Sequence, residues 1–193
     1  PCGVSIHKNN LKSYQLALAC DPISAFGGIV SCNFKITKTL ALKLKNIFLE
    51  VIISNGFDPE ALKILKKKKN LRLIDASTFM MNSLIKFNSA NDTILTQSED
   101  LKAFNIKDFK IVSKKKPNKF QLRNLIFAFN VCRYVKSNAI VLAANDVTVG
   151  IGSGQSSRLD SCQIAVEKMN KFNNFKEDLV AASDAFFPFV DGI

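Results

Sequence analysis

Histidine and tryptophan are scarce or absent in this 193-residue sequence, and the scarcity of histidine argues against two classes of enzyme. There is no tryptophan, and His7 is the only histidine. Zinc deaminases use His-x-Glu followed by Pro-Cys-x-x-Cys, but Ser5 stands where the second cysteine would follow Pro1-Cys2. A serine or cysteine nucleophile needs a basic partner, and His7 lies in a polar turn that is typical of a solvated loop. We therefore expect neither zinc nor a histidine-activated nucleophile.

Long apolar runs and cysteine pairs are also absent. No apolar stretch approaches the roughly 18 residues that cross a bilayer, and the first residues do not resemble a signal peptide. The five cysteines are odd in number and form no C-x-x-C pair, which indicates buried free thiols in a reducing cytoplasm. The sequence starts without methionine, and we take it as a piece of a longer chain. These features predict a cytoplasmic protein with no membrane partner.

Arginine is scarce although the chain is basic. The formal net charge is +11, but only four basic residues are arginine, and lysines form runs at 66–69 and 114–116. Lysine, asparagine, isoleucine and phenylalanine share A/T-rich codons, so genome composition explains much of the charge. Lysine runs are usually solvated helix ends or linkers. We therefore expect no nucleic-acid partner, although a non-catalytic basic module that binds a nucleotide or RNA is the alternative function.

The elements that are present alternate between helix and strand, which predicts an α/β fold with a mostly parallel sheet. Strands are predicted over 26–34, 50–54, 71–75, 108–113 and 178–185, and helices over 11–18, 40–48, 58–65, 119–136 and 159–169. Residues 139–144 and 147–152 predict a hairpin about Asn145-Asp146. Asp58 and Asn118 are the expected N-caps of two helices. The stretch 76–107 is expected to be irregular.

Residues 150–158, GIGSGQSSR, combine three glycines with two serines and Arg158. The spacing fails both the P-loop, which needs Gly-Lys at its end, and the dinucleotide pattern G-x-G-x-x-G. A strand, a glycine-rich turn and a helix that begins near Ser156 or Ser157 remain. The free N–H groups of such a helix start, together with Arg158, favour an anion. A tight turn with a surface arginine explains the residues equally well.

The stretch 186–191, FFPFVD, is an unusual end for a strand. One interpretation is a wall for a flat ring, with Asp191 accepting a hydrogen bond from an amine. The other interpretation is a plug for the core with an exposed acid. The residues alone do not separate these two.

Six stretches together resemble a known family. They are PCGV (1–4), DPISAFGGIV (21–30), EVII (50–53), VKSNAIV (135–141), GIGSGQSSR (150–158) and SDAFFPFVDG (183–192). In this order they look like the transformylase region of the bifunctional proteins that join 5-aminoimidazole-4-carboxamide ribonucleotide (AICAR) formyltransferase to IMP cyclohydrolase. The resemblance implies formyl transfer from 10-formyltetrahydrofolate to the 5-amino group of AICAR in purine biosynthesis.

The resemblance also implies an architecture. It is a duplicated, cytidine-deaminase-like three-layer α/β/α fold without zinc, in a homodimer with active sites at the subunit interface. Residues 1–113 would form the first lobe, without its beginning. Residues 114–193 would form a linker helix and the start of the second lobe.

The resemblance assigns roles to individual residues. Asn138 would be the catalytic amide that orients the reacting groups. Arg158, Phe186 and Gly56 would bind the nucleotide. The expected folate-binding residues are Pro188, Phe189 and Asp191, and the expected potassium-binding residues are Asp184 and Ser137.

Two departures from the family pattern matter. The family's Lys-His pair lies just upstream of the PCG motif, where this sequence begins, and His7 does not match it. Val190 replaces the arginine of FFPFRD, which would weaken the hold on the folate's glutamate tail. We expect the 193 residues by themselves to show no transformylase activity, and folate-dependent formylation by them would contradict this.

Overall fold

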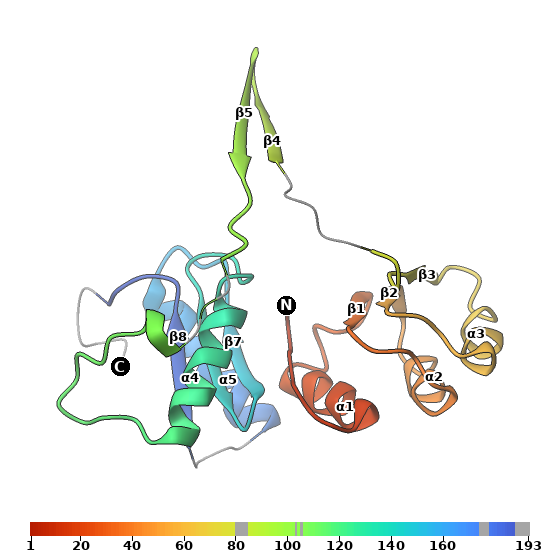
Figure 1. Ribbon diagram of the computed structural model, residues 1–193, viewed down its shortest axis with the longest axis horizontal. Helices are drawn as coiled ribbons and strands as arrows, with labels where there is room; N and C mark the ends of the chain where they lie inside the picture. The colour runs from red at the N-terminus through yellow and green to blue at the C-terminus, as the bar shows by residue number, and fades with distance from the viewer. Residues whose placement is uncertain (80–84, 103, 105, 174–177, 188–193) are drawn as a thin grey trace.

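Three separate sheets organise the chain in this computed structural model, which describes residues 1–79, 85–102, 104, 106–173 and 178–187 (Figure 1). The elements alternate between helix and strand along most of the chain, so the α/β class is confirmed. Only the first sheet is parallel, and the other two are antiparallel. The expected mostly parallel sheet therefore applies to the first part of the chain alone.

The first sheet has the order β1-β2-β3, with β1 at Gly28–Cys32, β2 at Leu49–Ser54 and β3 at Arg72–Asp75. The crossover helices are α2 (Lys38–Leu44) and α3 (Pro59–Leu65), and α1 (Asn10–Cys20) precedes β1. All three helices contribute to one core, in which Leu40, Leu44, Ile52 and Leu65 are fully buried. Asp58 lies at the expected N-cap of α3, but its side chain makes no cap hydrogen bond and instead pairs with Lys35 at 3.0 Å.

The second sheet has the order β7-β6-β8, with β6 at Ile140–Ala144, β7 at Val147–Gly152 and β8 at Val180–Ser183. The predicted hairpin about Asn145-Asp146 is confirmed, and both residues have positive φ angles of 51° and 58°. Helix α4 (Lys119–Cys132) packs on Val141 and Ala143, whereas α5 (Arg158–Phe172) packs on Ile140 and Leu142. Because strand residues alternate between faces, the two helices cover opposite faces of this sheet.

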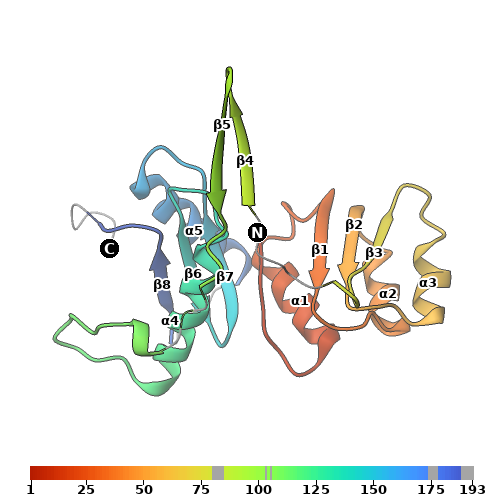
Figure 2. The same cartoon turned by 45° about the horizontal axis from the view of Figure 1, so that its top comes forward.

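The N-terminal segment runs along the second sheet before the chain enters α1 (Figures 1 and 2). The Thr148 N–H donates to the Val4 carbonyl at 2.9 Å, and the Ile6 N–H donates to the Asp146 carbonyl at 2.9 Å. Residues at the start of the chain thus lie beside β7, although β7 is more than 140 residues away in the sequence. The expected division at 113/114 stays a prediction.

Two predictions between residues 76 and 113 are wrong. The stretch expected to be irregular contains a hairpin of β4 (Ile85–Ala90) and β5 (Thr93–Ser98), which projects beyond the other two sheets (Figure 1). The predicted strand at 108–113 is absent. A short 3-10 helix, Ile106–Asp108, ends at the first of these residues, and the centre of the Phe109 ring lies 5.3 Å from that of Phe129 on α4. Packing of rings against a helix overrides the local alternation that favoured a strand.

The five cysteines are free thiols, as expected, although only Cys20 and Cys132 are fully buried. Burial raises the pKa of the Cys20 and Cys132 thiols to about 11. These two therefore behave as small apolar core residues at neutral pH. Within the described ranges, no helix is long and apolar enough to cross a membrane.

Candidate functional site

Strand register brings three distant parts of the sequence together at one end of the second sheet. Ile140 pairs with Gly152 on β7 and with Ser183 on β8. The residues just before Ile140 therefore lie between the glycine-rich turn after β7 and Asp184 after β8. Asn138 occupies this position, beside Arg158 at the start of α5.

Asn138 is held by its backbone and its side chain. The Nδ2 group donates to the carbonyls of Gln155 and Ser156 at 3.0 and 2.9 Å. Its carbonyl accepts from the Ser161 hydroxyl at 2.7 Å. Because Nδ2 is turned toward two carbonyl oxygens, Oδ1 is left to accept hydrogen bonds from the other side.

Arg158 joins the three segments. Its Nη2 donates to Asn138 Oδ1 at 2.8 Å, and its Nη1 donates to Ser183 Oγ at 2.7 Å and to Asp184 Oδ1 at 2.5 Å. The side chains of Arg158 and Asp184 are only 14% and 21% exposed. Such a partly desolvated, charge-assisted contact is stronger than a pair on the open surface.

The surroundings favour the ionised form of Asp184. Burial by itself would raise the pKa of this carboxyl group. Hydrogen bonds from the Ser137 hydroxyl, Arg158 and the Ala139 N–H, together with the charge of Arg158, outweigh burial and lower the pKa. Asp184 is therefore a carboxylate at neutral pH, and Arg158 is its counter-charge.

The three glycines of residues 150–154 have different structural roles. A Cβ at Gly150 or Gly152 would overlap the backbone of α5 at Ala165 or Ser161, so these two allow close helix packing. Gly154 has a φ of +68° with open space around it, so it makes the turn. The helix then begins as predicted, with the Ser157 hydroxyl accepting from the N–H groups of Leu159 and Asp160. Two of the three glycines therefore serve packing rather than an anion.

Metal ligands do not gather in the described part of the chain: no group of three or more histidine, cysteine, aspartate or glutamate side chains could hold an ion there. His7 is exposed, and its Nδ1 accepts from the Asn9 N–H at 2.9 Å. This confirms the interpretation of His7 as a loop residue. Asn138 offers a fixed amide oxygen, and Arg158 offers a guanidinium. Together they suit a polar ligand that donates a hydrogen bond to the amide oxygen and accepts one from the guanidinium.

Comparisons with known proteins agree with one another. The sequence profile of the family described as AICARFT/IMPCHase bienzyme matches residues 1–168. A bifunctional purine biosynthesis protein PurH from Buchnera aphidicola is 45% identical over 196 residues, covering 100% of this chain and 37% of the relative. Proteins of the same name from Brachyspira hyodysenteriae and Persephonella marina are 42% and 43% identical, covering 99% and 100% of this chain and 36% and 38% of those relatives.

The chain belongs to the AICARFT/IMPCHase bienzyme family. The match covers most of the sequence, and the chain spans a little over a third of the length of these curated relatives. Within this family member, four of the residues singled out in the sequence lie together: Ser137, Asn138, Arg158 and Asp184.

The remaining predicted residues lie elsewhere. Phe186 follows this cluster by two positions and is 80% exposed, so its ring has no cover in the described chain. Gly56 lies in the turn after β2 of the first sheet, where its carbonyl accepts from the Ile36 N–H and the Ser54 hydroxyl. Pro188, Phe189 and Asp191 lie outside the described residues.

Sequence reasoning missed Ser161 and Ser183. Ser161 is fully buried and its hydroxyl fixes the Asn138 carbonyl, while Ser183 Oγ accepts from Arg158. A buried serine on the sheet-facing side of α5, among Cys162, Ala165 and Met169, is the signal that could have found Ser161. Ser183 stands next to Asp184 in a strand that was already singled out.

Proposed function

We propose that this chain is part of the formyltransferase region of its family and acts in purine biosynthesis. The reaction moves a formyl group from 10-formyltetrahydrofolate to the 5-amino group of AICAR. The observation that supports this is the cluster of Asn138, Arg158 and Asp184 within a family member. For the complete protein we also propose IMP cyclohydrolase activity and a cytoplasmic homodimer whose active sites lie at the subunit interface.

Asn138 orients the attacking amine in this proposal. In the transfer, the amine nitrogen bonds to the formyl carbon and the bond from that carbon to the folate N10 breaks. The amine loses one proton and N10 gains one. The fixed Oδ1 of Asn138 accepts an N–H of the amine and directs the nitrogen lone pair toward the formyl carbon.

Arg158 binds the ribonucleotide in this proposal. A guanidinium has five N–H donors, and three of them reach Asn138, Ser183 and Asp184. The other two have no acceptor among the described residues, and in this proposal they donate to a phosphate oxygen or another acceptor of the nucleotide. Asp184 supports this role, because it holds the guanidinium in place and makes its direction independent of the ligand.

The other assigned residues complete the proposal. Phe186 and Gly56 contact the nucleotide, and Pro188, Phe189 and Asp191 contact the folate. Ser137 and Asp184 would hold a potassium ion. Hydroxyl and carboxylate oxygens are the donors that hard cations take, and the ion would share the carboxylate with Arg158.

Nucleotide binding by Arg158→Ala in the full-length protein tests the proposal. Loss of charged hydrogen bonds costs about 1.5–3 kcal/mol, so we expect the Kd for AICAR to rise roughly 10- to 100-fold in calorimetry. The matched control is Arg123→Ala, which removes a salt bridge to Asp146 at the β6–β7 turn and should change this Kd by less than about twofold. Equal AICAR affinity in Arg158→Ala and the parent, with both folded, would contradict the proposal.

The alternative of a non-catalytic basic module is not favoured, because the matched family is one of enzymes. The same variants separate the two functions. If Arg158→Ala changed only a salt-dependent affinity for RNA and not the affinity for AICAR, the module would replace the enzyme as the better explanation.

A further inference from the structure

The main chain at Asn138 has a contact that comes from the interior of the protein. Its carbonyl accepts from the Ser161 hydroxyl at 2.7 Å, and Ser161 is fully buried. By contrast, the Asn138 N–H and Nδ2 donate to carbonyls in the turn before α5, at Gln155 and Ser156, and Ser156 is exposed. The Ser161 hydroxyl therefore ties Asn138 to the core rather than to the surface turn.

Ser161 itself has a fixed place, because α5 lies very close to β7 at this point. A Cβ at Gly152 would overlap the Ser161 carbonyl, so the glycine lets the helix backbone touch the strand. Gly152 pairs with Ile140, which follows Asn138 by two positions. Strand pairing, helix packing and the serine hydrogen bond therefore form a closed chain of contacts around Asn138.

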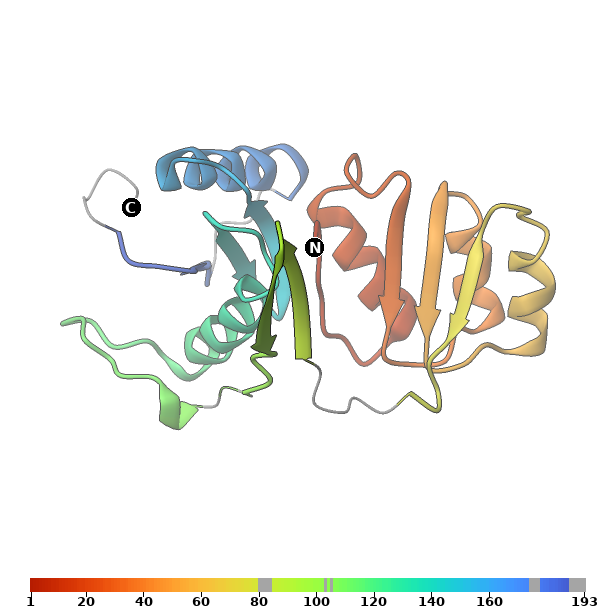
Figure 3. The same cartoon turned by 90° about the horizontal axis from the view of Figure 1, so that it is seen from above.

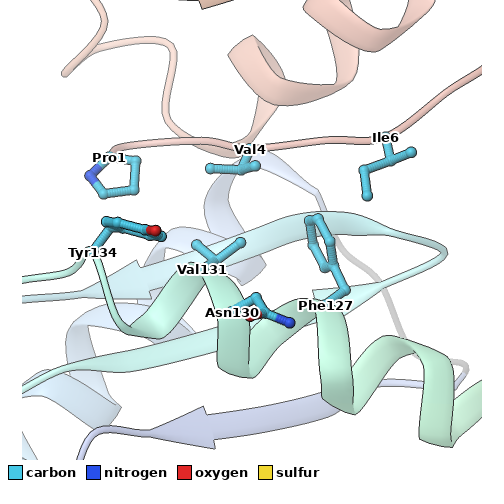
Figure 4. A pocket seen from close by; sticks show the side chains of 7 residues that line it. All are labelled: Pro1, Val4, Ile6, Phe127, Asn130, Val131 and Tyr134. Carbon is cyan, nitrogen blue, oxygen red and sulfur yellow. The ribbon is translucent and has the colours of Figure 1, made fainter. Parts of the chain in front are cut away.

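The position of Ser161 excludes direct contact with a ligand. Helices α5 and α4 cover opposite faces of the second sheet (Figure 3). An apolar groove of about 280 Å³ lies on the α4 side, with Val4 of the N-terminal segment on one side and Phe127 of α4 on the other (Figure 4). Ser161 does not line this groove, and its buried hydroxyl is directed at the Asn138 carbonyl. Any effect of Ser161 on a reaction thus acts through Asn138.

We propose that Ser161 is a positioning residue, which holds the Asn138 amide in the orientation that the reaction needs. This role rests on the proposed formyl transfer, in which Asn138 Oδ1 accepts an N–H of the attacking amine. The Ser161 hydroxyl fixes the main chain from which that side chain extends, so Oδ1 keeps one direction before a ligand binds. Orientation affects the rate strongly, because a misplacement of about 1 Å can cost about 100-fold.

Nucleotide binding does not depend on this orientation. Arg158 donates to Ser183 and Asp184 at the end of β8, and neither contact involves Ser161. The guanidinium therefore keeps its place when the Ser161 hydroxyl is removed. Loss of an interaction that serves only the transition state lowers kcat and kcat/KM by the same factor and leaves KM unchanged.

Steady-state kinetics of the full-length protein test the role of Ser161. We expect Ser161→Ala to lower kcat about 10- to 100-fold and to change the KM for AICAR less than about twofold. Ser161→Cys keeps a side chain of similar size with a weak donor, so its kcat should lie between those of Ser161→Ala and the parent. A parental kcat in Ser161→Ala, equal kcat values in both variants, or a larger change in KM than in kcat would overturn the proposal.

Asn173→Ala is the matched control, because it loosens the other end of the same helix. Asn173 is the C-cap of α5, and its Nδ2 donates to the Val149 carbonyl on β7 at 2.9 Å. We expect its kcat to stay within about twofold of the parental value. Equal loss of kcat in Asn173→Ala and Ser161→Ala would show that docking of α5, rather than the bond to Asn138, controls the rate, and would rule out the positioning role.

Melting temperatures and the activity of the parent separate the possible causes of a negative result. If Ser161→Ala does not fold, Ser161→Cys decides by the same criterion, a lower kcat at an unchanged KM. If the parent itself does not formylate AICAR with 10-formyltetrahydrofolate, both the formyl transfer and the role of Ser161 are wrong. If the parent is active and Ser161→Ala matches it, only the role of Ser161 is wrong.

Discussion

At the scale of single residues, the site depends on one arginine. Arg158 connects Asn138, which precedes β6, to Ser183 and Asp184 at the end of β8. Sequence reasoning placed Arg158 against a phosphate and Asp184 beside a cation. In the structure the two side chains are each other's partners, so any ligand meets a guanidinium that is already oriented.

The lowered pKa of Asp184 predicts a pH dependence of stability. A carboxyl group whose folded-state pKa lies below the ordinary value of about 3.9 adds stability that is complete well above that value and is lost as the pH falls through the folded-state pKa. We therefore expect Asp184→Asn to lower the melting temperature most at pH 7, with a difference that shrinks below about pH 4. Thermal unfolding of both proteins from pH 7 to pH 3 measures this. A constant difference across the range would show that Asp184 does not contribute through its charge.

At the scale of elements, the strand–turn–helix unit that carries Arg158 depends on glycine for two different reasons. Gly152 lies against the Ser161 backbone of α5, and Gly154 turns the chain with a positive φ. The close packing at Gly152 brings Ser161 within hydrogen-bond distance of the Asn138 carbonyl. The tight fit of α5 on β7 therefore positions the site.

Substitutions in this turn separate the two reasons. Gly152→Ala forces α5 away from the sheet, and overpacking of this kind costs about 1–3 kcal/mol. Gly154→Asn should cost less than about 1 kcal/mol, because the space around it is open and asparagine tolerates the left-handed region. Denaturant unfolding of the two variants gives the order. If Gly154→Asn were the more harmful change, the packing role of Gly152 would be wrong.

Local sequence patterns predicted some of the helices and strands but not others. Helix α4 and the β6–β7 hairpin were predictable, because long apolar periodicity and an Asn-Asp turn dominate their conformations. The β4–β5 hairpin was not, because both of its faces are exposed and its alternation of polar and apolar residues is weak. The false strand at 108–113 arose because Phe109 packs on Phe129, a contact that sequence spacing does not reveal.

At the scale of the whole molecule, α1 connects the two larger sheets. Tyr14 belongs to the core of the first sheet, whereas Cys20, at the end of the same helix, belongs to the core of the second. The next residue, Asp21, is almost fully buried, and its Oδ2 lies 2.7 Å from Lys168 Nζ on α5. Burial would raise the pKa of Asp21, but hydrogen bonds from Lys168 and Ser24 and the lysine charge lower it overall.

The Asp21–Lys168 contact predicts coupling between these two parts. Lys168→Met leaves a buried carboxylate without its partner, and we expect a loss of roughly 1–3 kcal/mol, less than for a fully buried pair because the lysine is a third exposed. Adding Asp21→Asn should recover part of this loss in a double-mutant cycle. The control Lys171→Met, one turn nearer the end of α5, should cost less than about 0.5 kcal/mol. Strict additivity of the Asp21 and Lys168 changes would rule out the coupling.

The sequence by itself determined the α/β class, most helices and strands, and the family, because each follows from local periodicity or from residues in order. It also pointed to Asn138, Arg158 and Asp184 as separate positions. Only the tertiary structure decided that these three share hydrogen bonds, that Ser161 supports them, and that Gly56 lies apart from them, in the turn after β2 of the first sheet. Strand register sets those neighbours, and register depends on packing between segments far apart in the chain, which no local pattern encodes.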